Sequence, residues 1–153
     1  MSNKLKKNIF LLIFPIVILS GCRDNYVSSI PNYRVSIQLN LTSTYPTFKN
    51  NPNQFLIFET PPKYGESVGF GGIIIYAGVN PDEYFAFDLA CPYEATKTIK
   101  VVPSDYFGRV ICETCGSVYE ISSSGAFPIE GPSKEPLKQY KTSLQGDWLH
   151  IFN

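Results

Sequence analysis

Two cysteine-containing segments decide the fold of this chain. They read Asp88-Leu89-Ala90-Cys91-Pro92-Tyr93-Glu94 and Val110-Ile111-Cys112-Glu113-Thr114-Cys115-Gly116-Ser117. In both, an apolar run typical of a β-strand leads directly into a short cysteine loop. Two loops of this kind, placed against each other, are how a small β domain presents ligands to a metal centre.

The residues before these segments favour β-strands. Tyr33–Asn40 alternates apolar and polar residues with a period of two, which predicts a half-buried strand. Phe55–Phe58 is predicted as a short buried strand and Ile73–Tyr76 as a strand buried on both faces. Thr42–Gln54 between them is rich in Asn, Pro, Ser and Thr and is predicted as a loop.

Short strands at even spacing continue to the end of the chain, and no segment carries a helical stripe. The predicted strands are Tyr84–Asp88, Thr98–Val102, Arg109–Ile111, Val118–Ile121, Lys138–Leu144 and Trp148–Phe152. Turn signals separate them, so the fold class is all-β, an antiparallel sandwich or barrel. The glycines at positions 69, 71 and 72 precede a strand and not a helix, so they do not indicate a phosphate-binding loop.

In order and spacing, these motifs resemble the Rieske domain over residues 73–151. The matching motifs are Cys91-Pro92, Cys112-x-x-Cys115-Gly116-Ser117, Tyr119, Gly125, Gly131-Pro132, Pro136-Leu137 and Tyr140. The resemblance implies a Rieske-like antiparallel β-sandwich or barrel with a small loop subdomain, about residues 89–132, that carries the cysteine loops. It also implies that Gly131-Pro132 begins a loop covering the two cysteine loops, and that the three cysteines converge.

The ligand positions depart from the family pattern. In a Rieske centre two cysteines hold one iron and two histidines hold the other. The resemblance puts Cys91 and Cys112 at the cysteine positions, but Tyr93 and Cys115 at the histidine positions. The only histidine of the chain, His150, is far along the sequence from both loops. One histidine cannot complete a two-cysteine, two-histidine [2Fe-2S] cluster, so that cofactor is not expected.

Three interpretations of the loops remain open. In the first, no metal binds, Tyr93 packs into the cluster space, and a Cys91–Cys112 or Cys112–Cys115 disulfide leaves one thiol free. In the second, Cys112 and Cys115 form a Cys-x-x-Cys metal knuckle that binds zinc together with Cys91, and Tyr93, Glu94 or water completes the tetrahedron. In the third, the three cysteines and the Tyr93 phenolate hold an atypical iron–sulfur cluster.

The start of the chain has the features of a lipoprotein signal peptide. Lys4, Lys6 and Lys7 precede an apolar run, Ile9–Leu19, that is shorter than the roughly 20 residues of a membrane-spanning helix. The run ends in Leu19-Ser20-Gly21-Cys22, which resembles the bacterial lipobox.

The lipobox resemblance gives the domain organisation. It implies that residues 1–21 are removed and that Cys22 is lipidated. Residues 22–32 are then expected to be a tether and residues 33–153 the folded domain, which has enough residues for one hydrophobic core.

Charge excludes one class of partner. The chain has 13 basic and 13 acidic residues, and removal of Lys4, Lys6 and Lys7 leaves 10 against 13, a net charge of −3. No cluster of Lys or Arg remains, so nucleic acid is not an expected partner.

These observations predict an extracytoplasmic domain held on a bacterial membrane by lipid. Its expected role is that of a non-catalytic binding or structural module, with an envelope or respiratory protein as partner. The alternative is an electron carrier with an atypical iron–sulfur cluster.

Overall fold

The computed structural model describes residues 27–153, and within this range the fold is all-β, as predicted. The signal peptide, the lipidation site at Cys22 and the first part of the expected tether lie outside the described residues. Among residues 27–153, no helix is both long and apolar enough to cross a bilayer.

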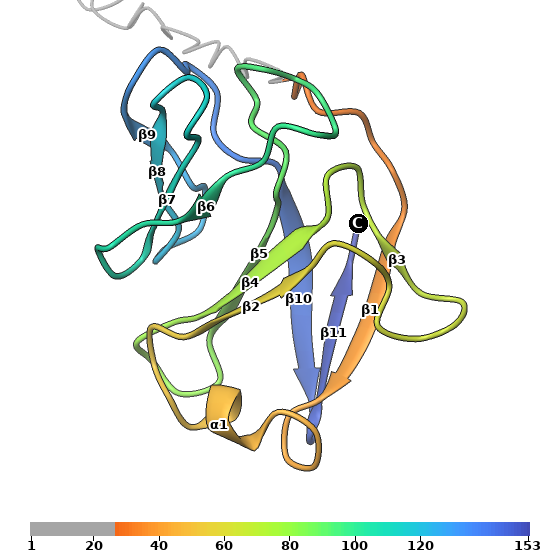
Figure 1. Cartoon of the computed structure of the whole chain (residues 1–153). Coiled ribbons are helices and arrows are strands. Elements are labelled where there is room, and N and C mark those ends of the chain that lie inside the picture. Colours follow the sequence, from red (N-terminus) through yellow and green to blue (C-terminus); the bar gives the residue numbers. More distant parts are fainter. Residues whose placement is uncertain (1–26) are drawn as a thin grey trace, which may run out of the picture.

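The larger of two antiparallel sheets has seven strands in the order β2-β4-β5-β10-β11-β1-β3 (Figure 1). The strand bounds are β1 Val35–Asn40, β2 Phe55–Phe58, β3 Ser67–Val68, β4 Ile73–Ala77, β5 Tyr84–Asp88, β10 Gln139–Gln145 and β11 Trp148–Phe152. Strand β10 joins the two halves of the sheet, because Tyr140 pairs with Ala86 of β5 whereas Ser143 pairs with His150 of β11. The halves curve around one apolar core.

The smaller sheet carries the second cysteine loop. Its strands, in the order β6-β7-β8-β9, are β6 Val102–Pro103, β7 Arg109–Ile111, β8 Val118–Glu120 and β9 Pro128–Glu130. In Figure 1 they lie together beside one end of the larger sheet. The expected architecture, an all-β main body with a small subdomain that bears the cysteine loops, is confirmed.

Strand β4 is buried on both faces, as the sequence predicted. Ile73 and Ile75 belong to the core inside the seven-stranded sheet, whereas Ile74 and Tyr76 belong to a second core shared with the cysteine subdomain. Alternate side chains of a strand point to opposite faces, so the subdomain covers the outer face of β4. The two buried faces explain the unbroken β-branched run.

Four local predictions need correction. Strand β2 forms as predicted but is not buried: it is an edge strand in which Phe55 is 43% and Ile57 37% exposed. A short helix, α1 (Pro46–Lys49), lies within the predicted loop, and proline suits its first turn. Strand β1 starts at Val35 and leaves Tyr33 exposed. The first strand of the 98–111 hairpin is only Val102–Pro103.

Candidate metal centre

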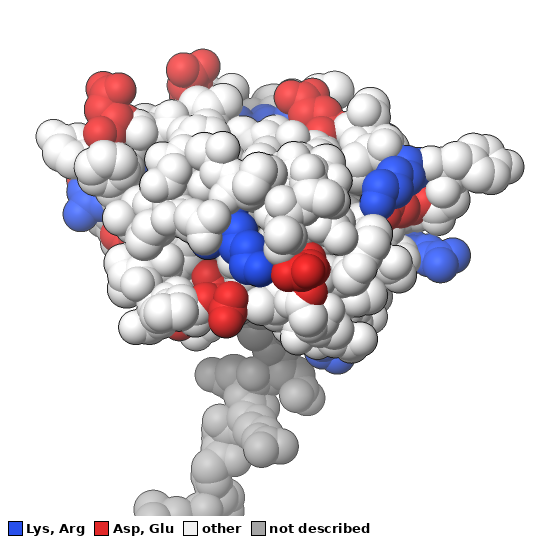
Figure 2. Space-filling view, turned by 90° about the horizontal axis from the view of Figure 1, so that it is seen from below, with Lys and Arg blue, Asp and Glu red and all other residues white. Residues whose placement is uncertain are grey.

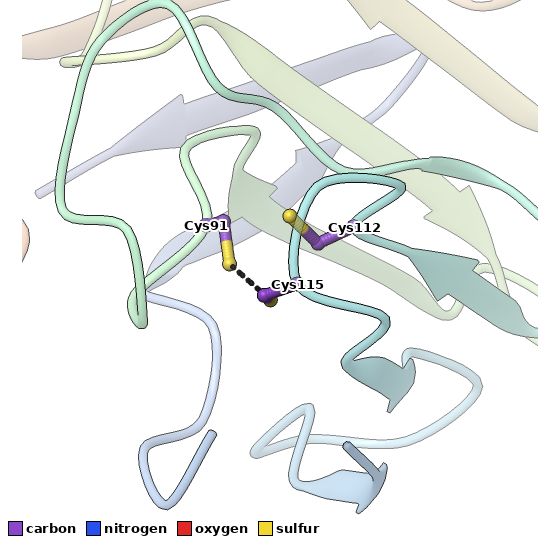
Figure 3. A group of neighbouring side chains, drawn as sticks. All are labelled: Cys91, Cys112 and Cys115. Atoms are coloured by element: carbon purple, nitrogen blue, oxygen red, sulfur yellow. Dashed lines mark hydrogen bonds between the residues drawn. The ribbon is translucent and has the colours of Figure 1, made fainter. Parts of the chain in front are cut away.

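The three cysteines of the described chain converge, as expected. The Sγ atoms of Cys91, Cys112 and Cys115 all lie within 4.8 Å of one another, and the Cys91 and Cys115 sulfurs are 3.7 Å apart (Figure 3). Cys91 and Cys112 are fully buried, whereas Cys115 is partly exposed. No disulfide joins any of these three thiols.

The second loop is a tight turn between β7 and β8. The Gly116 N–H donates to the Cys112 carbonyl at 2.8 Å, and the Cys112 N–H donates to the Ser117 carbonyl at 2.9 Å. Gly116 has φ +74°, a conformation that costs glycine little and other residues more. This turn places Cys112 and Cys115 on the same side of the loop.

The first loop is closed by its own backbone. The Ala95 N–H donates to the Cys91 carbonyl at 2.9 Å, and the Cys91 N–H donates to the Ile99 carbonyl at 3.1 Å. These bonds fix the backbone of Cys91 at the end of β5, facing the second loop.

A buried carboxylate supports the base of the first loop. Asp88 is fully buried and accepts four hydrogen bonds, two on each oxygen. Oδ1 accepts from the N–H groups of Gly71 at 2.9 Å and Ala90 at 2.8 Å. Oδ2 accepts from the Phe70 N–H at 2.9 Å and the Tyr140 hydroxyl at 2.6 Å. Because Ala90 precedes Cys91, this network holds the loop where it leaves the sheet.

The network also accounts for the glycines that precede β4. A Cβ on Gly69 would collide with the Tyr140 hydroxyl, and one on Gly71 would lie 2.6 Å from the Ala90 nitrogen. Glycine backbone that binds an anion is common in ligand sites, but here the anion is the protein's own carboxylate. The sequence analysis missed the role of Asp88, although a lone acidic residue in an apolar run was a usable signal.

Two polar side chains contact the sulfurs. The Tyr119 hydroxyl lies 3.5 Å from the Cys91 sulfur, and the Ser117 hydroxyl lies 3.2 Å from the Cys115 sulfur. The Ser133 N–H donates to the Ser117 hydroxyl at 3.1 Å and so orients it. The sequence motifs included Tyr119 and Ser117, but only the structure shows that they touch the cysteines.

The segment that begins at Gly131 was expected to cover both cysteine loops, and its contacts place it against the second one. A Cβ on Gly131 would lie 2.5 Å from the Cα of Ser117, so only glycine permits this close approach. This close approach and the hydrogen bond from the Ser133 N–H to the Ser117 hydroxyl pack the segment tightly against the turn that carries Cys112 and Cys115.

The surroundings of the thiols shift their acidities in opposite directions. Burial raises the pKa of Cys112 to about 12. Burial also acts to raise the pKa of Cys115, but hydrogen bonds from the Ser117 side chain and backbone and from the other two cysteines lower it overall. Cys115 therefore ionises more readily than Cys112.

Two other ligand candidates, Glu94 and His150, lie outside the group of the three cysteines. Tyr93 is 56% exposed, so it lacks the burial required of an aromatic ring that fills the cluster space. Among the described residues, the metal-ligating group contains the three cysteines and no carboxylate or imidazole. His150 lies in β11, paired with Gln38 of β1 and Ser143 of β10 in the main sheet.

Two solved structures are similar to this chain. One is a complex of reduced oxygenase and oxidized ferredoxin in carbazole 1,9a-dioxygenase, with 12% identity over 66% of this chain and 90% of that chain and a TM-score of 0.43. The other is the quaternary ammonium Rieske monooxygenase CntA in complex with an inhibitor, with 14% identity over 80% of this chain and a TM-score of 0.47. This chain spans 31% of that monooxygenase chain. No family model and no curated protein matches the sequence.

Proposed function

We propose that this chain is a lipid-anchored, extracytoplasmic Rieske-like module in which Cys91, Cys112 and Cys115 bind a single zinc-like ion. Its role is non-catalytic: it serves as a binding or structural part of an envelope complex. The convergence of the three sulfurs within 4.8 Å carries the proposal.

The sulfur spacing fits one tetrahedral ion. Zinc–thiolate bonds of about 2.3 Å give sulfur–sulfur edges of about 3.8 Å in a tetrahedron. The Cys91 and Cys115 sulfurs, 3.7 Å apart, match such an edge. Cys112 completes one face of the tetrahedron with little movement, since its sulfur lies within 4.8 Å of both others.

The donor set does not fit a standard Rieske cluster. That cluster needs two histidines on one iron, and the only imidazole, His150, is in the main sheet and outside the cysteine group. The three sulfurs all lie within 4.8 Å of one another, so they form a single group suited to one ion.

The surroundings of the centre favour binding over catalysis. Three cysteines leave the fourth position of a tetrahedral ion to water or to a group from a partner, approaching beside the partly exposed Cys115. A metal-bound water needs a nearby base for hydrolytic chemistry. Among the described residues, no carboxylate or imidazole belongs to the cysteine group.

Metal analysis of the full chain, purified anaerobically, tests the centre. We expect one zinc per chain and no visible absorption. Cys112→Ser and Cys115→Ser should each weaken zinc binding by at least about tenfold, whereas Thr114→Ser, an exposed change in the same loop, should not. Reduced, metal-free thiols after zinc addition would refute the zinc site. A coloured, iron-containing protein would instead favour the electron-carrier alternative.

The membrane anchor rests on the sequence Leu19-Ser20-Gly21-Cys22. The full chain, expressed in bacteria with labelled fatty acid, should incorporate the label, and Cys22→Ala should abolish it. If the variant still incorporates labelled fatty acid, the anchor is wrong while the zinc site is unaffected.

A further inference from the structure

The end of the expected tether is fastened to the domain beside the first cysteine loop. The Ser29 hydroxyl donates to the Pro92 carbonyl at 2.8 Å, and the Ser29 N–H donates to the Glu135 carboxylate at 3.0 Å. Ile30 is fully buried. The Lys138 ammonium donates to the carbonyls of Ile30 at 3.2 Å and Pro31 at 2.9 Å. A free tether would therefore stop before Ser29, and not at residue 32.

These contacts determine where the chain leaves the domain. Pro92 follows Cys91 directly, and Glu135 follows the segment that covers the second cysteine loop. Figure 1 shows the first described residues at the same end of the molecule as both cysteine loops, with α1 at the opposite end. The connection to residue 22 thus starts at the cysteine-loop end.

The connection is short compared with the domain. Five residues lie between Cys22 and Ser28, and a fully extended chain over the six steps from one to the other reaches about 20 Å. A compact domain of the described length has a radius of gyration of about 14 Å and a diameter of about 36 Å. A lipid on Cys22 would keep the cysteine-loop end near the bilayer and would not let the α1 end turn to face it.

The surface at the exit point suits a lipid interface. Val27 is 82% exposed, and Tyr93, next to Pro92, is 56% exposed. Tyrosine combines an apolar ring with a polar hydroxyl and is enriched where the headgroups meet the hydrocarbon. At the opposite end, Figure 2 shows acidic and basic side chains interspersed, and there Lys49 pairs with Asp147 at 3.0 Å.

We propose that the cysteine-loop end faces the lipid surface of the membrane that holds the anchor, with Tyr93 in the headgroup region. The orientation follows from the docked Ser29–Pro31 segment, which makes the connection short. It rests on the proposed lipidation of Cys22. The partly exposed Cys115 is then presented to the membrane side.

Fluorescence quenching by brominated lipid tests the orientation. The lipidated full chain is placed in vesicles of phosphatidylcholine and phosphatidylglycerol whose acyl chains are brominated near the headgroups. Two variants are made in a Trp148→Phe background, so that each carries a single tryptophan. One is Tyr93→Trp, at the cysteine-loop end, and the other is Val79→Trp, at the α1 end. Val79 is 64% exposed and shares a surface pocket with Lys49 of α1, so it is the matched control. We expect quenching several-fold stronger at position 93, and equal quenching would overturn the proposal.

A longer connection provides the second test. A Gly/Ser insertion of about 20 residues after Asn25 has a root-mean-square span of about 25 Å and lets the domain turn. We expect the insertion to reduce the difference in quenching between positions 93 and 79. An unchanged difference would overturn the role of the short connection.

Flotation of each protein with the vesicles separates the two proposals. A protein that floats and carries lipid on Cys22, but shows equal quenching, refutes the orientation alone. A protein that does not float and carries no lipid refutes the anchor in the proposed function, and with it the orientation.

Discussion

At the scale of single residues, Asp88 shows how a buried charge is kept in an apolar environment. Transfer of a carboxylate from water into a protein interior costs several kcal/mol unless hydrogen bonds replace its hydration. Three backbone N–H groups and the Tyr140 hydroxyl supply those bonds to Asp88. The donors come from the Gly69–Gly72 turn, the first cysteine loop and β10, so one side chain ties three segments together.

Loss of this carboxylate should strongly destabilise the domain. Asp88→Ala leaves four donors without partners, and we expect the free energy of unfolding to fall by about 3–5 kcal/mol. Tyr140→Phe removes one bond and should cost about 1.5–3 kcal/mol. Urea unfolding measures both. Asp105→Ala, a change at an exposed residue, is the control and should stay within about 0.5 kcal/mol of the wild type. A similarly small change for Asp88→Ala would contradict the support role.

The acidity of Cys115 is a second property of single residues. Ser117 stabilises the Cys115 thiolate, so Ser117→Ala should raise the pKa of that thiol. The rate at which an alkylating reagent modifies the metal-free protein, measured against pH, should then have its midpoint at higher pH. Ser124→Ala, an exposed change in the β8–β9 turn, should leave the midpoint in place. An unchanged midpoint in Ser117→Ala would show that the hydroxyl does not act on the sulfur.

At the scale of elements, β4 connects the two cores. One set of its side chains packs inside the main sheet, and the other packs against the cysteine subdomain. Its neighbour β2 has an equally apolar sequence, yet it lies at the sheet edge with one row of side chains exposed. β2 and β4 are paired in register, so they run side by side in the same sheet. Their difference in burial therefore comes from what covers each strand.

A matched pair of substitutions measures that difference. Ile74 of β4 is fully buried, and its partner in the register, Ile57 of β2, is 37% exposed. We expect Ile74→Ala to lower the free energy of unfolding by about 2–5 kcal/mol, the range for buried isoleucine, and Ile57→Ala to cost clearly less. Urea unfolding of both variants is the measurement. Equal losses would mean that the subdomain does not seal the outer face of β4.

At the scale of the whole molecule, the cysteine centre joins two loops that are distant in sequence. Cys91 leaves the main sheet after β5, whereas Cys112 and Cys115 belong to the smaller sheet. An ion held by all three would link the sheets in addition to the shared apolar core. A metal that binds the folded state and not the unfolded state stabilises the folded state. Removal of zinc by a chelator should therefore lower the midpoint temperature of thermal unfolding of the zinc-loaded protein.

Zinc affinity should increase with pH. The pKa of the Cys112 thiol is about 12 without metal, so this thiol is protonated at neutral pH and must lose its proton when zinc binds. Each proton released makes the apparent affinity rise by about tenfold per pH unit. Competition with a chelator between pH 6 and 8 measures the slope. Affinity that is independent of pH would contradict thiolate ligation.

Local pattern in the sequence predicted most of the strands but not the two short strands β3 and β9, and the Rieske resemblance implied that the cysteine loops meet. Alternation of side chains specifies a strand locally, and Cys-x-x-Cys with glycine specifies a tight turn. The Rieske resemblance implied a covering segment at Gly131-Pro132, and the structure gives the reason for the glycine, since its close approach to Ser117 requires the absence of a side chain.

Contacts between segments far apart in the chain determine which apolar strand is buried and what surrounds the cysteines. Phe55–Phe58 and Ile73–Ala77 read alike because local pattern carries no information on which face another element covers. The partners of Asp88 and the docking of Ser29 on Pro92 join residues far apart in the chain. Such contacts exist only after the chain has folded, because spacing along the sequence does not specify distance in space.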